Sequence, residues 1–342
     1  MRKPRVVVIT GASAGVGRAT ALEFARHGAH IALLARNRES LEAARAEVES
    51  QGVRALVLPL DVADAQAVEN AAESVESQLG PIDVWVNDAM VTVFSPVALL
   101  QPDEVRRVTD VTYLGTVNGT LAALRRMLER NRGVIIQVGS ALSYRAIPLQ
   151  AAYCGAKFAI RGFTTSLRTE LLHTRSRVHV TMVQMPALNT PQFDWCRTRL
   201  PDKPQPVPPI YQPELAARAI YWSSRHRRRE LYVGGSTFAA IWGNRLLAGW
   251  LDHYLARTGY AAQSSHELID PDRPDNLWES PPGDRGAHGR FDARASDHST
   301  QLMLSTHRGW LLTAGLAGIA LGGWIARHGS RRSGKPRRAA RL

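Results

Sequence analysis

The feature that most constrains the fold is a glycine-rich turn near the amino terminus, set between an apolar run and a helical pattern. Residues 5–10 (RVVVIT) form a short, β-branched run that is typical of a buried strand. The turn reads TGASAGVG over residues 10–17, and a helical pattern follows from Arg18 to His27. A strand, a glycine-rich turn and a helix in this order let the backbone approach a pyrophosphate at a helix amino terminus. The pattern therefore predicts the first unit of a dinucleotide-binding parallel sheet.

A second motif places a tyrosine and a lysine on one helix. Tyr153 and Lys157 are four residues apart, so they share one face of a helix. An ammonium group at that distance is expected to lower the pKa of the phenol from its usual value of about 10. Such a tyrosine can exchange a proton with a carbonyl or an alcohol near neutral pH. Ser140 follows another predicted strand, 133–138, at the sheet edge where open α/β sheets bind their ligands.

Together these motifs resemble the short-chain dehydrogenase/reductase family over roughly residues 4–235. The resemblance is carried by TGASAGVG, by Asp61-Val62 after a third predicted strand, and by Ser140, Tyr153 and Lys157. It implies an α/β fold of the Rossmann type, a doubly wound parallel sheet of about seven strands with helices on both faces. It also implies an enzyme that transfers a hydride between a nicotinamide cofactor and a carbonyl or alcohol group.

The resemblance assigns roles to individual residues. Ser140 would hydrogen-bond the carbonyl oxygen, Tyr153 would donate the proton, and Lys157 would lower the pKa of the tyrosine and bind the ribose. Thr112 stands where the family usually has an asparagine in a proton relay, so its catalytic role is open. The residues expected to bind the cofactor are Gly11, Ser13, Ala14, Gly15, Val16, Gly17, Arg36, Asp61, Val62, Asn87, Ala89, Tyr153, Lys157, Pro186 and Thr190.

The end of the second predicted strand, 30–34, bears on the choice of cofactor. An acidic residue there would bind the ribose hydroxyls of NAD, whereas an arginine accommodates the 2′-phosphate of NADP. The chain has Ala35 followed by Arg36, which favours NADP(H) over NAD(H). The alternative is that Arg36 is only a solvated residue at a helix start.

Three positions depart from the family pattern. Asp88 and Met90 lie in an NDAM sequence where the family has NNAG, and Ala187 replaces a usual glycine. The departures at Asp88, Met90 and Thr112 leave open a second hypothesis, a non-catalytic dinucleotide-binding scaffold or sensor at a membrane. The intact Ser140, Tyr153 and Lys157 favour the enzyme.

The segment after the sixth predicted strand is expected to cover the substrate. Phe193 and Trp195 suggest a sizeable apolar ligand, although packing of the loop explains them equally well. Residues 201–213 are rich in proline and predict an extended strap. Two cysteines give no disulfide framework, and the scattered histidines have no metal-ligand spacing.

The chain continues well beyond the catalytic unit. We expect a Rossmann-type catalytic domain over 1–235, an apolar helical extension over 236–258 and a partly disordered linker over 259–305. A transmembrane or interfacial helix over 309–326 and a basic tail over 327–342 would follow.

Residues 309–326 form an uncharged run of 18 residues bracketed by Trp310 and Trp324. That length barely spans a hydrocarbon core of about 30 Å, and tryptophans are typical of membrane interfaces. The tail carries seven Lys/Arg and no acid, which favours the cytoplasmic side. Because no secretory signal precedes the catalytic unit, that unit is also expected in the cytoplasm, so a spanning or an interfacial helix remains open. The sequence thus predicts a membrane-attached homo-oligomer with a cytoplasmic catalytic domain, and no nucleic-acid partner.

Overall fold

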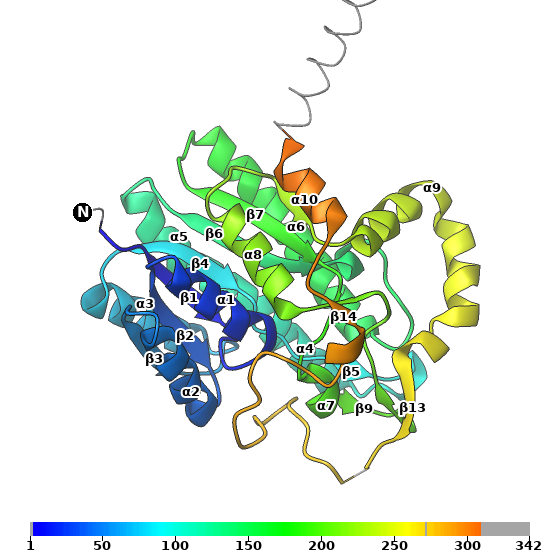
Figure 1. Ribbon diagram of the computed structural model, residues 1–342. Helices are drawn as coiled ribbons and strands as arrows, with labels where there is room; N and C mark the ends of the chain where they lie inside the picture. Colours follow the sequence, from blue (N-terminus) through cyan, green and yellow to red (C-terminus); the bar gives the residue numbers. More distant parts are fainter. Residues whose placement is uncertain (1–2, 271, 309–342) are drawn as a thin grey trace, which may run out of the picture.

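The computed structural model describes residues 3–270 and 272–308, and it is built on a seven-stranded parallel sheet (Figure 1). The strand order is β12-β7-β6-β4-β1-β2-β3. The strands are β1 (Val6–Thr10), β2 (His30–Ala35), β3 (Ala55–Pro59), β4 (Ile82–Asn87), β6 (Val134–Ser140), β7 (His179–Met185) and β12 (Glu230–Tyr232). The predicted doubly wound sheet is therefore confirmed.

The strand order reverses at β1, and this reversal positions the site. The chain runs outward from β1 through β2 to β3, and then returns to place β4 on the other side of β1. In open parallel sheets such a reversal leaves a crevice at the carboxyl ends of the strands, where ligands bind. Thr10, Asn87, Ser140 and Met185 end their strands at that edge.

Helices cover both faces of the sheet. The first face carries α1 (Gly15–Arg26), α2 (Arg38–Glu49) and α8 (Pro213–Ser223), with α1 and α8 side by side (Figure 1). The second face carries α3 (Ala65–Gln78), α5 (Gly115–Glu129) and α6 (Ala151–His173). Successive residues of β1 alternate between the two cores, so the whole strand is buried. Burial on both faces explains why the strands read as continuous apolar runs.

The helical region between β4 and β6 is interrupted. It consists of α4 (Pro102–Val108), a π-helical turn (Thr109–Leu114) and α5. A π turn widens the hydrogen-bonding ring by one residue, which sequence periodicity does not reveal.

The carboxyl-terminal part adds α9 (Gly235–Thr258), which is kinked at Leu247, where φ is −137° and ψ is 37°. This helix lies to one side of the sheet (Figure 1), and it contains the helix predicted over 238–255. The short elements are β5 (Val93–Phe94), β8 (Ala187–Leu188), α7 (Gln192–Trp195), β9 (Arg197–Thr198), β10 (Asp202–Pro204), β11 (Ile210–Tyr211), β13 (Ser264–Leu268), β14 (Ala295–Ser296) and α10 (Thr300–Thr306).

The segment expected to be a linker, 259–305, returns to the catalytic unit. Its β13 pairs with β10 and its β14 pairs with β11. Between these strands the chain is irregular, but Leu277 and Phe291 are buried. Isolated anchors and backbone hydrogen bonds hold this segment, which explains why its sequence shows no periodic pattern.

Within residues 3–270 and 272–308, no helix is both long enough and apolar enough to cross a membrane. The run 309–326 and the tail 327–342, on which membrane attachment was predicted, lie outside the described residues.

Candidate active site

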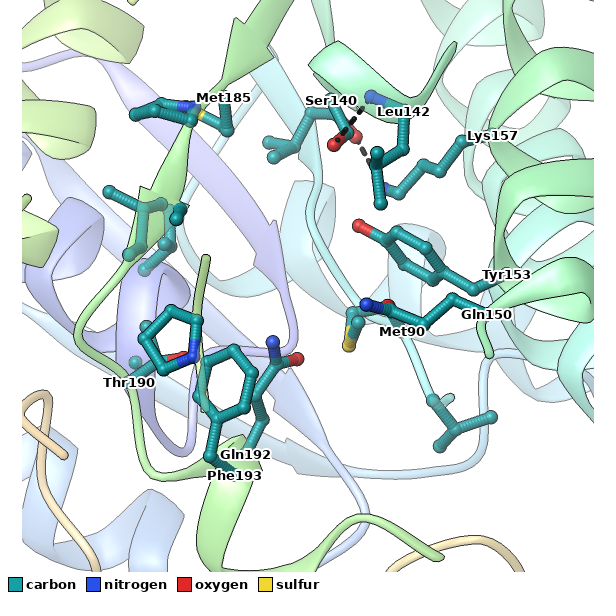
Figure 2. Close-up of a pocket in the computed structure, with 18 of the residues that line it drawn as sticks. Met90, Ser140, Leu142, Gln150, Tyr153, Lys157, Met185, Thr190, Gln192 and Phe193 are labelled. Atoms are coloured by element: carbon teal, nitrogen blue, oxygen red, sulfur yellow. Dashed lines mark hydrogen bonds between the residues drawn. The ribbon is translucent and has the colours of Figure 1, made fainter. Parts of the chain in front are cut away.

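Ser140, Tyr153 and Lys157 come together where β6 ends and α6 begins (Figure 2). Ser140 is the last residue of β6, whereas Tyr153 and Lys157 lie in the first turns of α6. The lysine Nζ is 5.5 Å from the centre of the tyrosine ring, as expected for residues four apart on a helix. Figure 2 shows the phenolic hydroxyl of Tyr153 pointing toward Ser140.

The hydroxyl of Ser140 is oriented by the short 3₁₀ turn that follows β6. Its Oγ accepts a hydrogen bond from the N–H of Leu142 at 3.1 Å, and the Ser140 N–H donates to Ser143 Oγ at 3.2 Å. A serine hydroxyl can accept and donate at the same time, so its proton is free for an oxygen in the cleft. Ser140 can therefore polarise a carbonyl group placed beside Tyr153.

Lys157 lies within the electrostatic influence of Asp88, an acid that the family pattern lacks. Its side chain is buried, and its Nζ donates a hydrogen bond to the Val138 carbonyl at 2.6 Å. Burial lowers the pKa of Lys157, and the Asp88 carboxylate opposes that shift. Burial likewise raises the pKa of Asp88, and Lys157 and the Gly17 N–H oppose it. Asp88 is thus part of the electrostatics of the site.

The expected lowering of the tyrosine pKa is wrong for this geometry. Burial, the neighbouring Cys154 and the Asp88 carboxylate raise the pKa of Tyr153, whereas a hydrogen bond with Ser140 lowers it. Desolvation of the phenolate is the largest cause of this shift, and the Lys157 ammonium donates its hydrogen bond to the Val138 carbonyl. Tyr153 is consequently held as the neutral phenol, which is the proton-donating form.

Thr112, the candidate relay residue, is committed to the backbone. Its side chain is fully buried, and its hydroxyl donates to the Val91 carbonyl at 3.1 Å and accepts from the Val91 N–H at 3.2 Å. These two bonds fix the loop after β4 and use the hydroxyl proton, which leaves one acceptor lone pair on the oxygen. The structure thus gives Thr112 a positioning role, and its part in a proton relay stays a prediction.

A cavity of about 760 Å³ runs from the glycine-rich turn to the catalytic tyrosine. This volume falls within the range of about 300–1,000 Å³ that is typical of ligand sites. The predicted cofactor-binding residues that line it are Gly11, Ser13, Ala14, Gly15, Val16, Arg36, Asp61, Val62, Ala89, Tyr153, Lys157, Pro186 and Thr190.

The other two predicted cofactor residues are structural. A Cβ on Gly17 would lie 2.2 Å from the Gly11 carbonyl oxygen, so this glycine lets α1 pack against the turn. The buried Asn87 amide donates to Thr120 and Gln137 and accepts from Trp85 Nε1. Whether Gly17 and Asn87 also contact the cofactor stays a prediction.

The amino end of α1 suits a phosphate group. Its N-cap residue, Ala14, has no side-chain acceptor; of the N–H groups of the first turn, that of Gly15 donates to the Gly286 carbonyl at 3.1 Å and that of Gly17 to the Asp88 carboxyl. Gly11 and Gly15 have positive φ values of 74° and 57°, which let the backbone curve around the head of the cleft. The residues present therefore fit a nicotinamide dinucleotide, with the pyrophosphate at α1.

Arg36 has unexpected partners. Its guanidinium donates to the carbonyl oxygens of Asn276 at 2.6 Å and Trp278 at 2.9 Å. No sequence pattern indicates that a segment 240 residues downstream reaches the end of β2. The role of Arg36 toward a 2′-phosphate remains a prediction.

The far end of the cavity is apolar and is formed partly by α9. Leu251, Tyr254 and Leu255 of α9 line it together with Phe193. The ring of Phe193 also packs against other aromatic rings, so this residue both fills the loop and faces the cavity. The apolar pattern of α9 predicted a helix, but it did not show that the helix would line the site.

Comparisons with known proteins agree with this site. The sequence profile described as "short chain dehydrogenase" matches residues 5–198. An uncharacterized oxidoreductase, YxnA, of Bacillus subtilis is 32% identical over 290 residues, which cover 84% of this chain and 82% of that protein. A fatty acyl-CoA reductase of Acinetobacter baylyi is 29% identical over 241 residues, 70% of this chain and 79% of that protein.

A solved structure has the same fold. The alcohol dehydrogenase from Thermococcus sibiricus, complexed with 5-hydroxy-NADP, aligns with a TM-score of 0.59 and 28% identity. The alignment covers 67% of this chain and 95% of that one. With the profile match and the YxnA alignment, this shows that the chain belongs to the short-chain dehydrogenase family and is an NAD(P)-dependent oxidoreductase.

Proposed function

We propose that the protein is an NADP-dependent enzyme that interconverts a lipophilic carbonyl compound and its alcohol. The observation that carries this proposal is one continuous cavity with Ser140, Tyr153 and Lys157 between a dinucleotide-binding half and an apolar half. A reactive oxygen at this junction would meet the hydroxyls of Ser140 and Tyr153 together.

In the proposed mechanism, the nicotinamide cofactor supplies or receives the hydride. The hydroxyl of Ser140 donates a hydrogen bond to the substrate oxygen and fixes its position. The neutral phenol of Tyr153 then transfers its proton to that oxygen as negative charge develops there. Lys157 provides a positive charge beside the phenol, which stabilises the phenolate left after the transfer.

The preference for NADP rests on the charge around the end of β2. Ala35 leaves this position without an acid, and Arg36 adds a positive charge at the cavity wall. The neighbouring Arg107 is paired with Asp61, so the acid that is present there is neutralised. The NADP analogue in the Thermococcus structure is consistent with this proposal.

The lipophilic nature of the substrate rests on the apolar half of the cavity. Its walls come from α9 and from the aromatic loop around Phe193. The relative named as a fatty acyl-CoA reductase supports an extended apolar substrate.

Membrane attachment is also a proposal. Besides the run 309–326, it is supported by apolar side chains exposed on α9, beside the substrate end of the cavity. These include Leu246, which is 76% exposed, and Trp250, which is 61% exposed. Co-sedimentation of the full-length protein with phospholipid vesicles should be reduced by Trp250→Ser, and unchanged binding would contradict a role of α9.

The test of the function is oxidation of NADPH and NADH by the full-length protein over aldehydes and ketones of increasing size. We expect turnover with NADPH on the large apolar compounds. A preference for NADH would overturn the assignment of NADP as the cofactor, but the assignment of the protein as an oxidoreductase would stand. Cofactor binding without turnover of any carbonyl compound would favour the scaffold hypothesis.

A further inference from the structure

One segment of the chain follows the cofactor cleft from end to end. We define residues 276–291 as the C-terminal arm; it is drawn in orange in Figure 1 and passes the carboxyl ends of β1 and β2. At the end of β2 its carbonyls accept from Arg36. At the glycine-rich turn, Gly286 accepts a hydrogen bond from the Gly15 N–H at 3.1 Å. At the nicotinamide end, the Phe291 N–H donates to Asn189 Oδ1 at 3.0 Å.

Side-chain contacts fix the position of the arm. Leu277 is fully buried in the same apolar cluster as Val62, which is one of the predicted cofactor-binding residues. Asp284 forms an ion pair with the buried Arg18 at 3.2 Å. A Cβ on Gly289 would lie 2.5 Å from the carbonyl oxygen of Thr190, so the arm touches the nicotinamide loop directly. The arm is thus packed against the Rossmann core at both ends and in the middle.

The arm forms a wall of the cavity and leaves its interior open. Asn276, Ser280 and Pro281 line the same cavity as Arg36 and Asp61. The interior continues beneath them toward the glycine-rich turn. A dinucleotide bound along the turn would therefore have the arm on its outer side.

Asn276 is the arm residue with an unmet hydrogen-bonding requirement. Its side chain is 9% exposed, and within the described part of the chain its Oδ1 has no hydrogen-bond partner. Its backbone is fully used, because its N–H donates to the Trp195 carbonyl at 2.9 Å and its carbonyl accepts from Arg36. Buried polar groups are nearly always hydrogen-bonded, so an unpartnered amide at a cavity wall points to a ligand.

The neighbours of Asn276 indicate which half of the ligand it meets. Arg36, which it contacts, directly follows β2, the strand whose end recognises the adenosine ribose in dinucleotide-binding sheets. Arg107 donates to the next carbonyl of the arm, that of Leu277, at 2.9 Å and pairs with Asp61. The catalytic residues lie on α6 and at the end of β6, on the other side of β1.

We propose that the C-terminal arm completes the dinucleotide site and that the Asn276 amide hydrogen-bonds the adenosine half of the cofactor. An amide can accept from the adenine amino group or a ribose hydroxyl through its oxygen, and it can donate through its nitrogen. The proposal rests on the NAD(P) binding of the family and is independent of the preference for NADP. The arm thereby supplies a binding group from outside the strand–turn–helix units of the sheet.

The experiment measures dissociation constants on the full-length protein with two ligands. One is NADP⁺, and the other is ADP-ribose, which has the adenosine half but neither the nicotinamide nor the 2′-phosphate. Asn276→Ala should raise the dissociation constants of both ligands by about 3- to 10-fold, the effect expected for the loss of one hydrogen bond. The matched control is Glu279→Gln on the exposed part of the arm, which should leave both constants unchanged.

A nicotinamide-side variant supplies the opposite pattern. Thr190→Val should raise the dissociation constant of NADP⁺ and leave that of ADP-ribose unchanged, because Thr190 lines the other end of the cavity. The thermal midpoint of Asn276→Ala without ligand should equal that of the wild type, since the deleted amide oxygen has no hydrogen-bond partner among residues 3–270 and 272–308. An unchanged ADP-ribose constant in a folded Asn276→Ala variant would overturn the proposal. Equal weakening by Glu279→Gln would also overturn it, because the effect would then belong to the arm in general.

Discussion

At the residue scale, the reactive end of the cleft is governed by burial and by one acidic side chain. Desolvation favours the neutral forms of Tyr153, Lys157 and Asp88, and the attraction between Lys157 and Asp88 counteracts it for that pair. The spacing of Tyr153 and Lys157 predicted their common face. The pKa shifts could not be predicted from the sequence, because they depend on the surroundings of Lys157. These surroundings include the Val138 carbonyl of β6 and Asp88, which follows β4.

Tyr153→Phe removes the proposed proton donor while keeping the ring. We expect kcat to fall by about 10²- to 10⁴-fold, the usual contribution of a general acid, with the dissociation constant for the cofactor nearly unchanged. Steady-state kinetics and a binding titration on the same preparation measure the two effects. The control is Tyr113→Phe, a partly buried tyrosine packed against the core, which should keep its activity. Retention of full activity by Tyr153→Phe would contradict the mechanism.

Asp88→Asn restores the amide found in the family pattern and removes a negative charge from the site. Because Asp88 raises the pKa of Tyr153, its loss should lower that pKa. Carbonyl reduction needs the phenol, so activity should decline at a lower pH in the variant than in the wild type. The pH profile of kcat/KM in the reductive direction measures this shift. An unchanged or upward-shifted profile would show that Asp88 does not act on Tyr153, and Glu73→Gln on the exposed side of α3 is the control.

At the element scale, the sequence predicts the sheet well and the connections poorly. The seven strands and the flanking helices were expected within a few residues of their positions, because strands buried on both faces must be continuously apolar. The π turn before α5 was missed because one extra residue in a helical turn leaves the apolar pattern almost intact. The arm was missed for a different reason. Isolated buried residues such as Leu277 form no periodic apolar pattern in the sequence.

Two predicted cofactor contacts, Gly17 and Asn87, illustrate that a motif residue can also have a structural role. Both belong to family motifs beside the cofactor. In the structure, Gly17 allows close packing within the turn and Asn87 joins neighbouring elements. A motif shows that a residue is required at a position, but the geometry shows what it contacts.

Asn87→Ala tests the structural role of that asparagine. The substitution leaves Trp85 Nε1, Thr120 and Gln137 without their buried partner. An unsatisfied buried group costs about 1–3 kcal/mol, so we expect the free energy of unfolding to fall by about 2–3 kcal/mol. Urea denaturation measures this loss. A stable variant with weakened cofactor binding would reverse the assignment and make Asn87 a ligand-contacting residue.

At the scale of the whole molecule, the chain returns to its own amino-terminal unit to complete the cleft. The arm ends at the nicotinamide loop, where Asn189 binds both Phe291 and Asp292. His288, on the arm, joins this end to α8 through hydrogen bonds to Glu214 at 2.8 Å and Asp292 at 2.7 Å. A histidine between two carboxylates makes the docking of the arm depend on pH.

The pH dependence follows from the shift of the His288 pKa. Burial alone would lower this pKa, but the hydrogen bonds and charges of Asp292 and Glu214 outweigh it and raise the pKa above 6.5. The bridge therefore contributes its full stability below about pH 6.5, and the contribution is lost as the pH rises through the raised pKa. Because the side chain is 41% exposed, solvent screening limits the effect to about 1 kcal/mol or less.

His288→Gln should therefore lower the unfolding midpoint more at pH 6 than at pH 9, where the wild-type ring is neutral. Thermal denaturation of both proteins across this range measures the difference. Asp292→Asn removes one of the two carboxylates, so it should reduce the same pH-dependent difference even though its amide can still bond to the ring. If His288→Gln gave the same loss at every pH, the bridge would act as an uncharged hydrogen bond, and the arm would be held equally across the range.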